Sequence, residues 1–255
     1  RFWWVSDKRV VYSVAQNASM LESPELTGEL FAANRDGSGT DTLFGYRASD
    51  SRSGSTGTHI QKKEKEYARA WMLDDLRDDE NEALIKVERM NRTHVRVAGG
   101  ERLHPEVRRI NVKTGINRSI AVSPLTNGYF VTDNNGAVRF ASGQDDQQRT
   151  KVYYRKDNDA DWELVVDELD NKNISVPIRF NRAGDGAYFT CAGSKNRGGV
   201  CLWDVATRTF KTLWSGSGSE LTGFELTFDR QDLFAIRSMP SRTAVTLLDK
   251  NAGEA

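Results

Sequence analysis

The serine-rich segment SGSGSE (215–220) is the first candidate for chemistry, because a nucleophilic serine could cleave an ester or a peptide bond. Hydrolases that use such a serine often present it on a sharp strand-to-helix turn with the pattern G-x-S-x-G. No serine of this chain has glycine both two positions before and two positions after it. We therefore expect SGSGSE to be a connecting loop, and we expect no catalytic residue in it.

The histidines are the next candidates, since His59, His94 and His104 are the only side chains of this type that could act as a base. His59 lies in a Ser/Gly-rich segment, and the other two flank the stretch VRVAGGERL. His94, Glu101 and His104 could together hold a metal ion, but their spacing matches no common zinc pattern and no cysteine is nearby. We expect solvated loop residues, with no metal and no cofactor.

The segment DNDADWELVVDE (157–168) carries acids at positions 1, 3, 5 and 12 of a calcium-loop pattern. The glycine that the pattern needs at position 6 is replaced by Trp162. The part WELVV alternates in the manner of a strand. We expect a β-hairpin here and no calcium site.

An acidic run, DDLRDDENE (74–82), stands between two apolar stretches and is interpreted as a solvated hairpin tip. The alternative is an acidic rim that attracts a cationic group, such as the amino terminus of a peptide.

Cys191 and Cys201 flank a Gly-rich centre that is typical of a hairpin loop. Opposed residues of an antiparallel pair bring their Cα atoms within disulfide range. Two interpretations stay open, a disulfide or two half-buried free thiols. A disulfide would favour an oxidising compartment, such as the periplasm or the extracellular space, over the cytoplasm.

Composition excludes several classes of function. The 255 residues carry 36 Lys and Arg against 36 Asp and Glu, so no basic surplus points to nucleic acid. No apolar run is long enough to span a membrane. The chain begins RFWWVSDKRVVYSV, without an initiator Met or a signal-peptide pattern, and we interpret it as part of a longer protein.

The elements that carry these residues are predicted to be short strands, separated by Asp, Asn and Gly turns. The exception is IQKKEKEYARAWML (60–73), where at most a short helix could form after the Ser/Gly-rich loop at 49–59. We expect a flexible insertion at about 47–66. Trp203 and Asp204, in LWDVATRTFKTLW (202–214), resemble the dipeptide of WD repeats, but a single instance is weak evidence.

A repeat organises the strands. The second-hairpin turns, at Asn34, Asn111, Lys156, Asp204 and Asp249, are separated by 77, 45, 48 and 45 residues. An earlier hairpin precedes each of them: 4–14, 71–87, 129–142, 178–192 and 226–238. Four antiparallel strands in roughly 45 residues are typical of one β-propeller blade. The sequence predicts an all-β propeller with about five blades visible, as a partial propeller.

At the level of whole blades the chain resembles the N-terminal β-propeller of prolyl oligopeptidase-family serine peptidases, in the dipeptidyl and acylaminoacyl peptidase branch. The segments that carry the likeness are PIRFNRAGDGAYFTCAGSKNRGGVCLWDVATRTFKTL, WWVSDKRVVYSV, WMLDDLRDDENEALIKV, ELFAANRDGSGTDTLF and RINVKTGINRSIAVSP. The resemblance implies a C-terminal α/β-hydrolase domain that carries Ser, Asp and His and is absent here. It also implies a propeller that gates and positions peptide substrates without hydrolysing them.

Two alternatives remain. One is a free-standing propeller that binds a protein partner, as in the bacterial Tol system. The other is a propeller enzyme with a site in its central channel, which would need convergent carboxylates or histidines that the sequence does not single out.

Overall fold

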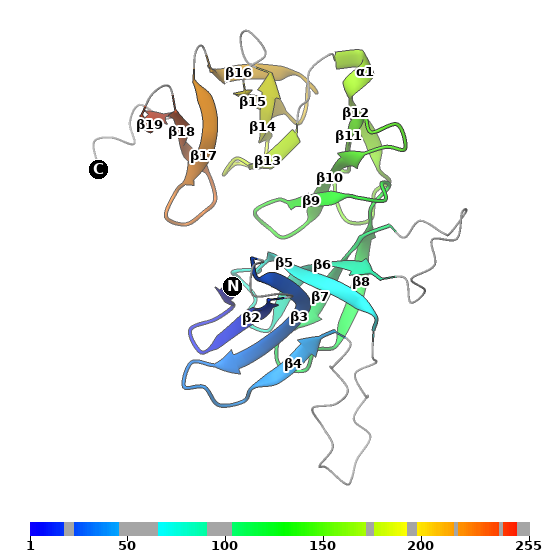
Figure 1. The fold of residues 1–255 in the computed structure, drawn as a ribbon. Coiled ribbons are helices and arrows are strands. Elements are labelled where there is room, and N and C mark those ends of the chain that lie inside the picture. The colour runs from blue at the N-terminus through cyan, green and yellow to red at the C-terminus, as the bar shows by residue number, and fades with distance from the viewer. Residues whose placement is uncertain are drawn as a thin grey trace. The chain divides into compact units, whose positions relative to one another are not determined.

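The computed structural model describes residues 1–17, 23–45, 66–90, 104–171, 176–192, 198–216, 219–239 and 242–248. In these ranges nearly all regular structure is β, arranged as five antiparallel sheets (Figure 1). None of the described helices is long and apolar enough to cross a membrane.

The strands of each sheet are consecutive in the chain. The first sheet contains β1 (Phe2–Trp4), β2 (Arg9–Gln16), β3 (Glu25–Asn34) and β4 (Asp41–Phe44), and the second β5 (Ala68–Asp74), β6 (Glu82–Arg89), β7 (Glu106–Asn111) and β8 (Asn117–Val122). The third contains β9 (Tyr129–Thr132), β10 (Val138–Gln144), β11 (Thr150–Tyr154) and β12 (Glu163–Asp167). The fourth contains β13 (Val176–Phe180), β14 (Gly186–Ala192), β15 (Gly198–Asp204) and β16 (Phe210–Ser215), and the fifth β17 (Glu220–Leu226), β18 (Leu233–Met239) and β19 (Ala244–Leu247).

This up-and-down order confirms the predicted fold class and the two series of hairpins. The first hairpins are β1–β2, β5–β6, β9–β10, β13–β14 and β17–β18. The turns at Asn34, Asn111, Lys156 and Asp204 each join the third strand of a sheet to the fourth. Asp249, the last of the predicted series, lies outside the described residues.

Two second-hairpin turns are built alike. Asn111 Oδ1 accepts hydrogen bonds from the backbone N–H groups of Lys113 (3.0 Å) and Thr114 (2.9 Å). Asp204 Oδ1 accepts them from Ala206 (3.0 Å) and Thr207 (2.7 Å), at the same spacing. The short polar side chain at the start therefore closes both turns, as the repeat predicted.

The helix prediction for 60–73 is wrong over its described part. Ala68–Asp74 is strand β5, because Ala68 and Ala70 alternate with exposed Arg69 and pack into a core that a helical turn would not reach. Residues 60–65, and all but the last of the expected insertion at 47–66, lie outside the described ranges. A four-residue helix that the sequence did not predict, α1 (Glu168–Asn171), follows β12.

The chain divides into two compact units, residues 1–127 and residues 128–255, and each has its own core. The first unit packs the two sheets β1–β4 and β5–β8 through a cluster of mostly small and aliphatic side chains. They are Val5, Val11, Leu30, Ala32, Leu43, Phe44, Ala68, Ala70, Ala83, Ile85, Val87, Ile110 and Val112.

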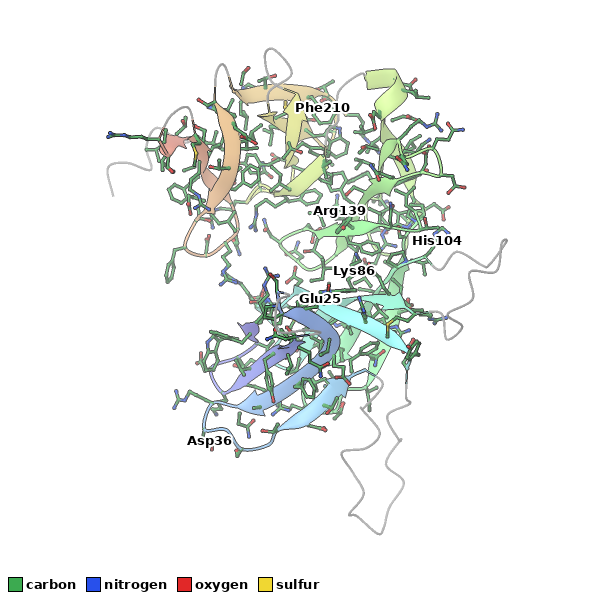
Figure 2. The ribbon with its side chains drawn as sticks, viewed as in Figure 1. Glu25, Asp36, Lys86, His104, Arg139 and Phe210 are labelled. Carbon is green, nitrogen blue, oxygen red and sulfur yellow. A yellow bond between two sulfur atoms is a disulfide. The ribbon has the colours of Figure 1, made fainter. Side chains whose placement is uncertain are left out.

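The second unit packs the sheets β9–β12 and β13–β16 mainly through aromatic rings: Phe140, Tyr154, Phe180, Phe189 and Trp203, with Val152, Val166 and Ala187 between them. A separate cluster of buried aliphatic side chains, Val200, Leu233 and Ile236, lies between β13–β16 and β17–β19. Ring centroids in this group are 5.0 to 6.2 Å apart. Figure 2 labels two residues at the edges of this cluster, Arg139 and Phe210; the Phe210 ring packs edge-on against Phe189 at 5.1 Å.

Candidate interaction face

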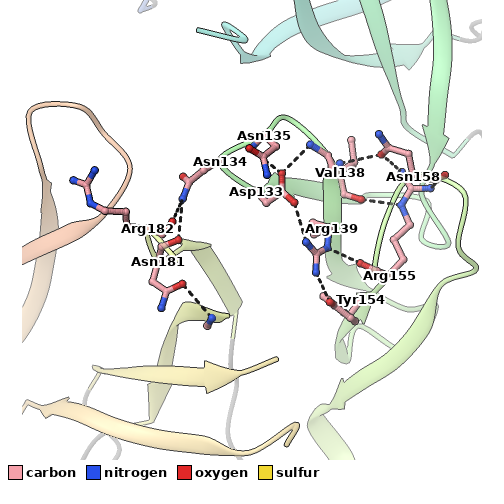
Figure 3. Close-up of polar contacts among 12 residues, drawn as sticks. Asp133, Asn134, Asn135, Val138, Arg139, Tyr154, Arg155, Asn158, Asn181 and Arg182 are labelled. Atoms are coloured by element: carbon pink, nitrogen blue, oxygen red, sulfur yellow. Dashed lines mark hydrogen bonds and ion pairs between the residues drawn. The ribbon is translucent and has the colours of Figure 1, made fainter. Parts of the chain in front are cut away.

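Hydrogen bonds link three first-hairpin turns of the second unit. They are residues 133–137 between β9 and β10, 181–186 between β13 and β14, and 227–232 between β17 and β18; together we call them the turn platform. Asn134 lies in the first turn and connects the platform, because its side-chain amide donates to the backbone carbonyls of Asn181 (2.8 Å) and Arg182 (3.5 Å) (Figure 3). The same amide donates to the carbonyl of Gln231 (3.4 Å).

Each turn is closed in the same way. The carbonyls of Asp133, Asn181 and Thr227 accept hydrogen bonds from the N–H groups three residues on, at 3.1, 3.1 and 2.7 Å. Those donors, Gly136, Gly184 and Arg230, all have positive φ angles of 76°, 73° and 54°. The glycines of DNNG and GDG thus supply the left-handed positions that the sequence predicted, while the third turn uses an arginine.

Charged side chains link the second and third turns. Arg182 donates through Nη1 to Asp229 Oδ2 and to Gln231 Oε1 (3.1 Å), and Arg179 donates to the carbonyl of Arg230. The hydrogen bond from Arg182 is the largest cause that lowers the pKa of Asp229, followed by the hydroxyl of Thr227. Asp229 is therefore an anion held in the platform at neutral pH.

A second layer of polar contacts lies behind the first turn (Figure 3). Arg139 donates to Asp133 Oδ2 (2.8 Å) and to the hydroxyl of Tyr154, and its guanidinium stacks on the rings of Tyr154 (5.2 Å) and Phe180 (5.0 Å). Asp133 Oδ1 in turn accepts the N–H groups of residues 135 and 137, both at 3.0 Å. The core thus fixes the aspartate that shapes the turn carrying Asn134.

Arg155, which directly follows β11, supports the β9–β10 hairpin. It is buried, and it donates to the carbonyl of Val138 (2.8 Å) and to Asn158 Oδ1 (2.9 Å), while its guanidinium stacks on Trp162 (4.5 Å). Burial lowers its pKa, and the negative charges of Asp157 and Asp159 offset only part of that effect.

The platform presents to solvent the side chains of Asn135, Arg182, Ala183, Asp185, Phe228 and Arg230. These groups offer hydrogen bonds, charge and an aromatic ring, which suits binding. Within the described residues, no three His, Cys, Asp or Glu side chains come together as a metal site.

Of the histidine cluster, only His104 is described (Figure 2), and its Nδ1–H donates to the carbonyl of Ser123 at 2.8 Å. His59, His94 and Glu101 lie outside the described residues, as do Ser217 and Gly218 of SGSGSE. Ser215 ends β16 and Glu220 begins β17, so the segment joins two sheets as expected.

The calcium-like segment is a hairpin arm, as expected. Its residues 163–167 form β12, paired antiparallel with β11, so the ligand positions of a calcium loop cannot converge on one point. Trp162 instead lies under Arg155.

The acidic run is the turn between β5 and β6, as expected, and part of its charge is paired. Arg109 donates to Asp79 Oδ2 (2.9 Å) and to Glu82. Hydrogen bonds, the largest from the N–H of Asn81, lower the pKa of Asp79 below its usual range. Asp78 and Glu80 remain exposed.

Trp203 and Asp204 belong to the framework. The Trp203 side chain is fully buried, between Phe140 at 5.4 Å and Tyr154 at 5.0 Å, and Asp204 closes its turn as described above.

A disulfide joins Cys191 on β14 to Cys201 on β15, with a Cα–Cα distance of 6.0 Å. The sequence argument assumed that the two cysteines lie directly opposite each other, and they do not. The register pairs Cys191 with Gly199 and Phe189 with Cys201, so the disulfide crosses the ladder diagonally. Both cysteines are buried.

Sequence reasoning missed the platform as a unit. It recognised each turn and described the tips as polar, but it did not notice Phe228 in the tip TFDRQD. An aromatic residue between the turn-forming Thr227 and Asp229 is the signal that could have identified it.

Five consecutive antiparallel meanders, four of them four-stranded, define the class of the chain as a β-propeller. No protein-family model and no curated protein matches it. Among solved structures it is similar to TolB from Acinetobacter baumannii, with a TM-score of 0.52 and 15% identity over 95% of this chain and 51% of that one.

Two peptidases are similar as well. One comes from a structural and mechanistic analysis of two prolyl endopeptidases (TM-score 0.53, 12% identity, 91% of this chain and 30% of that one). The other is the Pyrococcus horikoshii acylaminoacyl peptidase (TM-score 0.53, 12% identity, 98% of this chain and 37% of that one). At these identities the likeness shows the fold, and the chain spans about half or less of each of these three proteins.

Proposed function

We propose that this chain is the propeller part of a prolyl oligopeptidase-like serine peptidase, in which it gates and positions peptides for a C-terminal α/β-hydrolase domain. The observation that carries the proposal is the blade fold itself, which two peptidases share over nearly the whole of this chain. The blade-level resemblance of the sequence points to the same class, but it rests on the same blade pattern and no family model matches it.

The physical role would be selection by size. Blades packed face to face form a rigid body, and the ring of such a body leaves a narrow channel rather than an open cleft. An extended peptide can enter such an opening, whereas a folded domain cannot. The turn platform adds fixed donors and acceptors that could orient a peptide backbone.

The test compares this chain with a longer chain that includes the residues following it in the parent gene. We expect the longer chain to cleave aminoacyl or dipeptidyl chromogenic substrates. It should not cleave a folded protein that contains the same cleavable residues. The 255-residue chain alone should have no activity. Turnover by the short chain that survives repurification would contradict the proposal.

A second candidate is a free-standing propeller that binds a protein partner, and the likeness to TolB supports it because this chain covers 51% of that protein, a larger share than of either peptidase (30% and 37%). The parent gene separates the two. A G-x-S-x-G pattern within the downstream coding sequence supports the peptidase, and a stop codon directly after Ala255 supports the binding scaffold.

We also propose that the protein works in an oxidising compartment, periplasmic or extracellular. The Cys191–Cys201 disulfide supports this, because such bonds persist mainly outside the cytoplasm. Thiol labelling of the protein isolated from its native source checks it, since two reactive thiols would contradict it.

A further inference from the structure

The first sheet, β1–β4, carries apolar side chains on both of its faces. On one face Val11, Leu30 and Ala32 are buried in the core shared with the second sheet. The register places a second set on the opposite face, because residues paired directly across antiparallel strands point to the same side. Two rows cross β1, β2 and β3 there, and we call these six residues the open face: Phe2, Tyr12 and Phe31, and beside them Trp4, Val10 and Ala33.

The open face is apolar and incompletely covered in the structure. Phe2 is 67% and Trp4 is 49% exposed, and the other four residues are partly exposed. None of the six is charged. The rings of Tyr12 and Phe31 stack with their centroids 5.5 Å apart, so the two rows form one ordered surface. A contiguous apolar patch of this kind marks an interaction site, whereas single exposed apolar residues do not.

The fourth sheet, β13–β16, is also apolar on both faces and serves as an internal reference. Phe189 and Trp203 lie on its first face, in the core shared with the third sheet. Its second face carries a tyrosine, a valine and a tryptophan, the residue types that also stand on the open face: Tyr188, Val200 and Trp214. Val200 is fully buried, so this second face has a neighbour.

The neighbour of that face is the fifth sheet. It contributes apolar side chains from its first two strands, β17 and β18: Leu221, Phe224, Leu233 and Ile236. Each of the three core clusters described above lies between two sheets that follow one another in the chain. A sheet of the same polypeptide is therefore what covers an apolar sheet face in the described parts of this molecule.

We propose that the open face is covered by a further antiparallel sheet of the same polypeptide, outside these 255 residues, which presents apolar side chains from two adjacent strands. Tyr12 is then covered as Tyr188 is, which also lies on the second strand of its sheet. Burial of the apolar rows supplies the driving force, as it does between the other sheets. This goes beyond the proposed function, because a peptidase propeller and a free-standing scaffold need the contact equally.

Hydroxyl-radical footprinting, read by mass spectrometry, measures the exposure of the open face without any substitution. The 255-residue chain is compared with the full-length product of the parent gene. Oxidation of Phe2 and Trp4 should be severalfold slower in the full-length protein, because the covering sheet excludes solvent from both rings. Phe210 is the matched control, since it is an aromatic residue that is 40% exposed on β16, and it should react equally in both chains.

A charged substitution gives a second readout. Trp4→Lys should barely change the midpoint of thermal unfolding of the 255-residue chain, because the ring is half exposed there. In the full-length protein it should lower the midpoint by several degrees, because an unpaired charge would be buried against the covering sheet. Phe210→Lys is the control. It should shift both chains equally, since Phe210 packs on Phe189 within these residues.

Four results would overturn the proposal. Equal oxidation of Phe2 and Trp4 in the two chains would show that nothing covers the face. Protection in a dilute solution of the 255-residue chain would show that its own residues cover it, and protection that grows with the concentration of that chain would assign the face to a second copy. A parent gene that encodes no further residues would leave no sheet to cover it.

Cross-linking from position 4 in the full-length protein identifies the covering segment. Contact with a segment that lacks the strand pattern of a blade would also contradict the proposal. None of these outcomes bears on whether the full-length protein cleaves chromogenic substrates, so this proposal and the proposed function fail separately.

Discussion

The two units pack the same kind of sheet with different side chains. In residues 1–127 the faces meet through aliphatic and alanine side chains, such as Ala68, Ala70 and Ala83 on neighbouring strands. In residues 128–255 five aromatic rings fill the layer between the sheets β9–β12 and β13–β16. The comparison shows that blade topology fixes where a side chain must be buried but leaves its size open, provided the facing side chains compensate.

One arginine from each unit, the buried Arg108 and the half-buried Arg139, shows a different set of partners. In the first unit Arg108 is held by carboxylates, Glu66 at 2.5 and 2.7 Å and Glu106 at 2.5 Å. In the second, Arg139 has one carboxylate partner, Asp133, and two ring contacts. Arg108 therefore has two carboxylate partners and one ring contact, with Phe44, whereas Arg139 has one carboxylate partner and two ring contacts. The following predictions test how each unit depends on its own core contacts.

The largest effect is expected from Trp203→Ala, which removes the ring that contacts Phe140, Tyr154 and Phe189. A cavity of this size should lower the free energy of unfolding of the second unit by about 3–5 kcal/mol. Hydrogen exchange, read separately for residues 1–127, should leave the first unit unchanged. Trp203→Phe keeps an aromatic contact and should cost clearly less; equal losses for the two variants would contradict an aromatic core.

Arg108→Ala should destabilise the first unit by about 3 kcal/mol, since it leaves the buried Glu106 with the more distant cation of Arg89, at 3.5 Å, in place of the hydrogen-bonded one. Denaturant unfolding followed by circular dichroism measures this. The matched control is the neutral triple variant Arg108→Met, Glu66→Gln, Glu106→Gln, which should recover most of the loss. If the triple variant is as unstable as the single one, the arginine acts through packing on Phe44 and not through charge.

Reduction of the Cys191–Cys201 disulfide should destabilise the second unit by roughly 2–3 kcal/mol, the amount expected for the short loop that it closes. The midpoint of thermal unfolding with and without reductant checks this. The double variant Cys191→Ser, Cys201→Ser should be insensitive to reductant, and a wild type that is equally insensitive would contradict the bond.

The smallest effect concerns the matched turns at Asn111 and Asp204. The N–H of Thr207, and then its hydroxyl, lower the pKa of Asp204 in the folded chain. The ionised form thus stabilises the fold above the unfolded pKa of about 3.9, and that contribution is lost as the pH falls through the lower folded pKa. Asp204→Asn, which copies Asn111, should be nearly neutral at pH 7 and should remove this acid dependence. A large loss at neutral pH would show that the two turns are not equivalent.

Sequence reasoning found the blades because their turns depend on local chemistry. Asn111 and Asp204 close their own turns, and Gly136 and Gly184 take positive φ, so a few adjacent residues carry the whole signal. The strand at Ala68–Asp74 was mistaken for part of a helix because its burial is decided by distant residues, such as Ile85 and Val11.

The turn platform could not be predicted from the sequence, because it also depends on contacts between residues far apart in the chain. Asn134 contacts Asn181 and Gln231, which are 47 and 97 residues away in the chain. Arg208 is a related case: it takes a φ of 60° where the matched turn has Gly115, and it stacks on Tyr154 and Trp203 instead. Only the folded contacts explain an arginine at that position.

The single amide of Asn134 also makes three turns open as one. Local opening of residues 227–232 breaks its contact with Gln231, and opening of 181–186 breaks its contacts with Asn181 and Arg182. The amide protons of Gly136, Gly184 and Arg230, each bonded within its own turn, should therefore exchange with deuterium as a cooperative group. In Asn134→Ala they should exchange at three separate rates, and the platform would respond to a ligand one turn at a time.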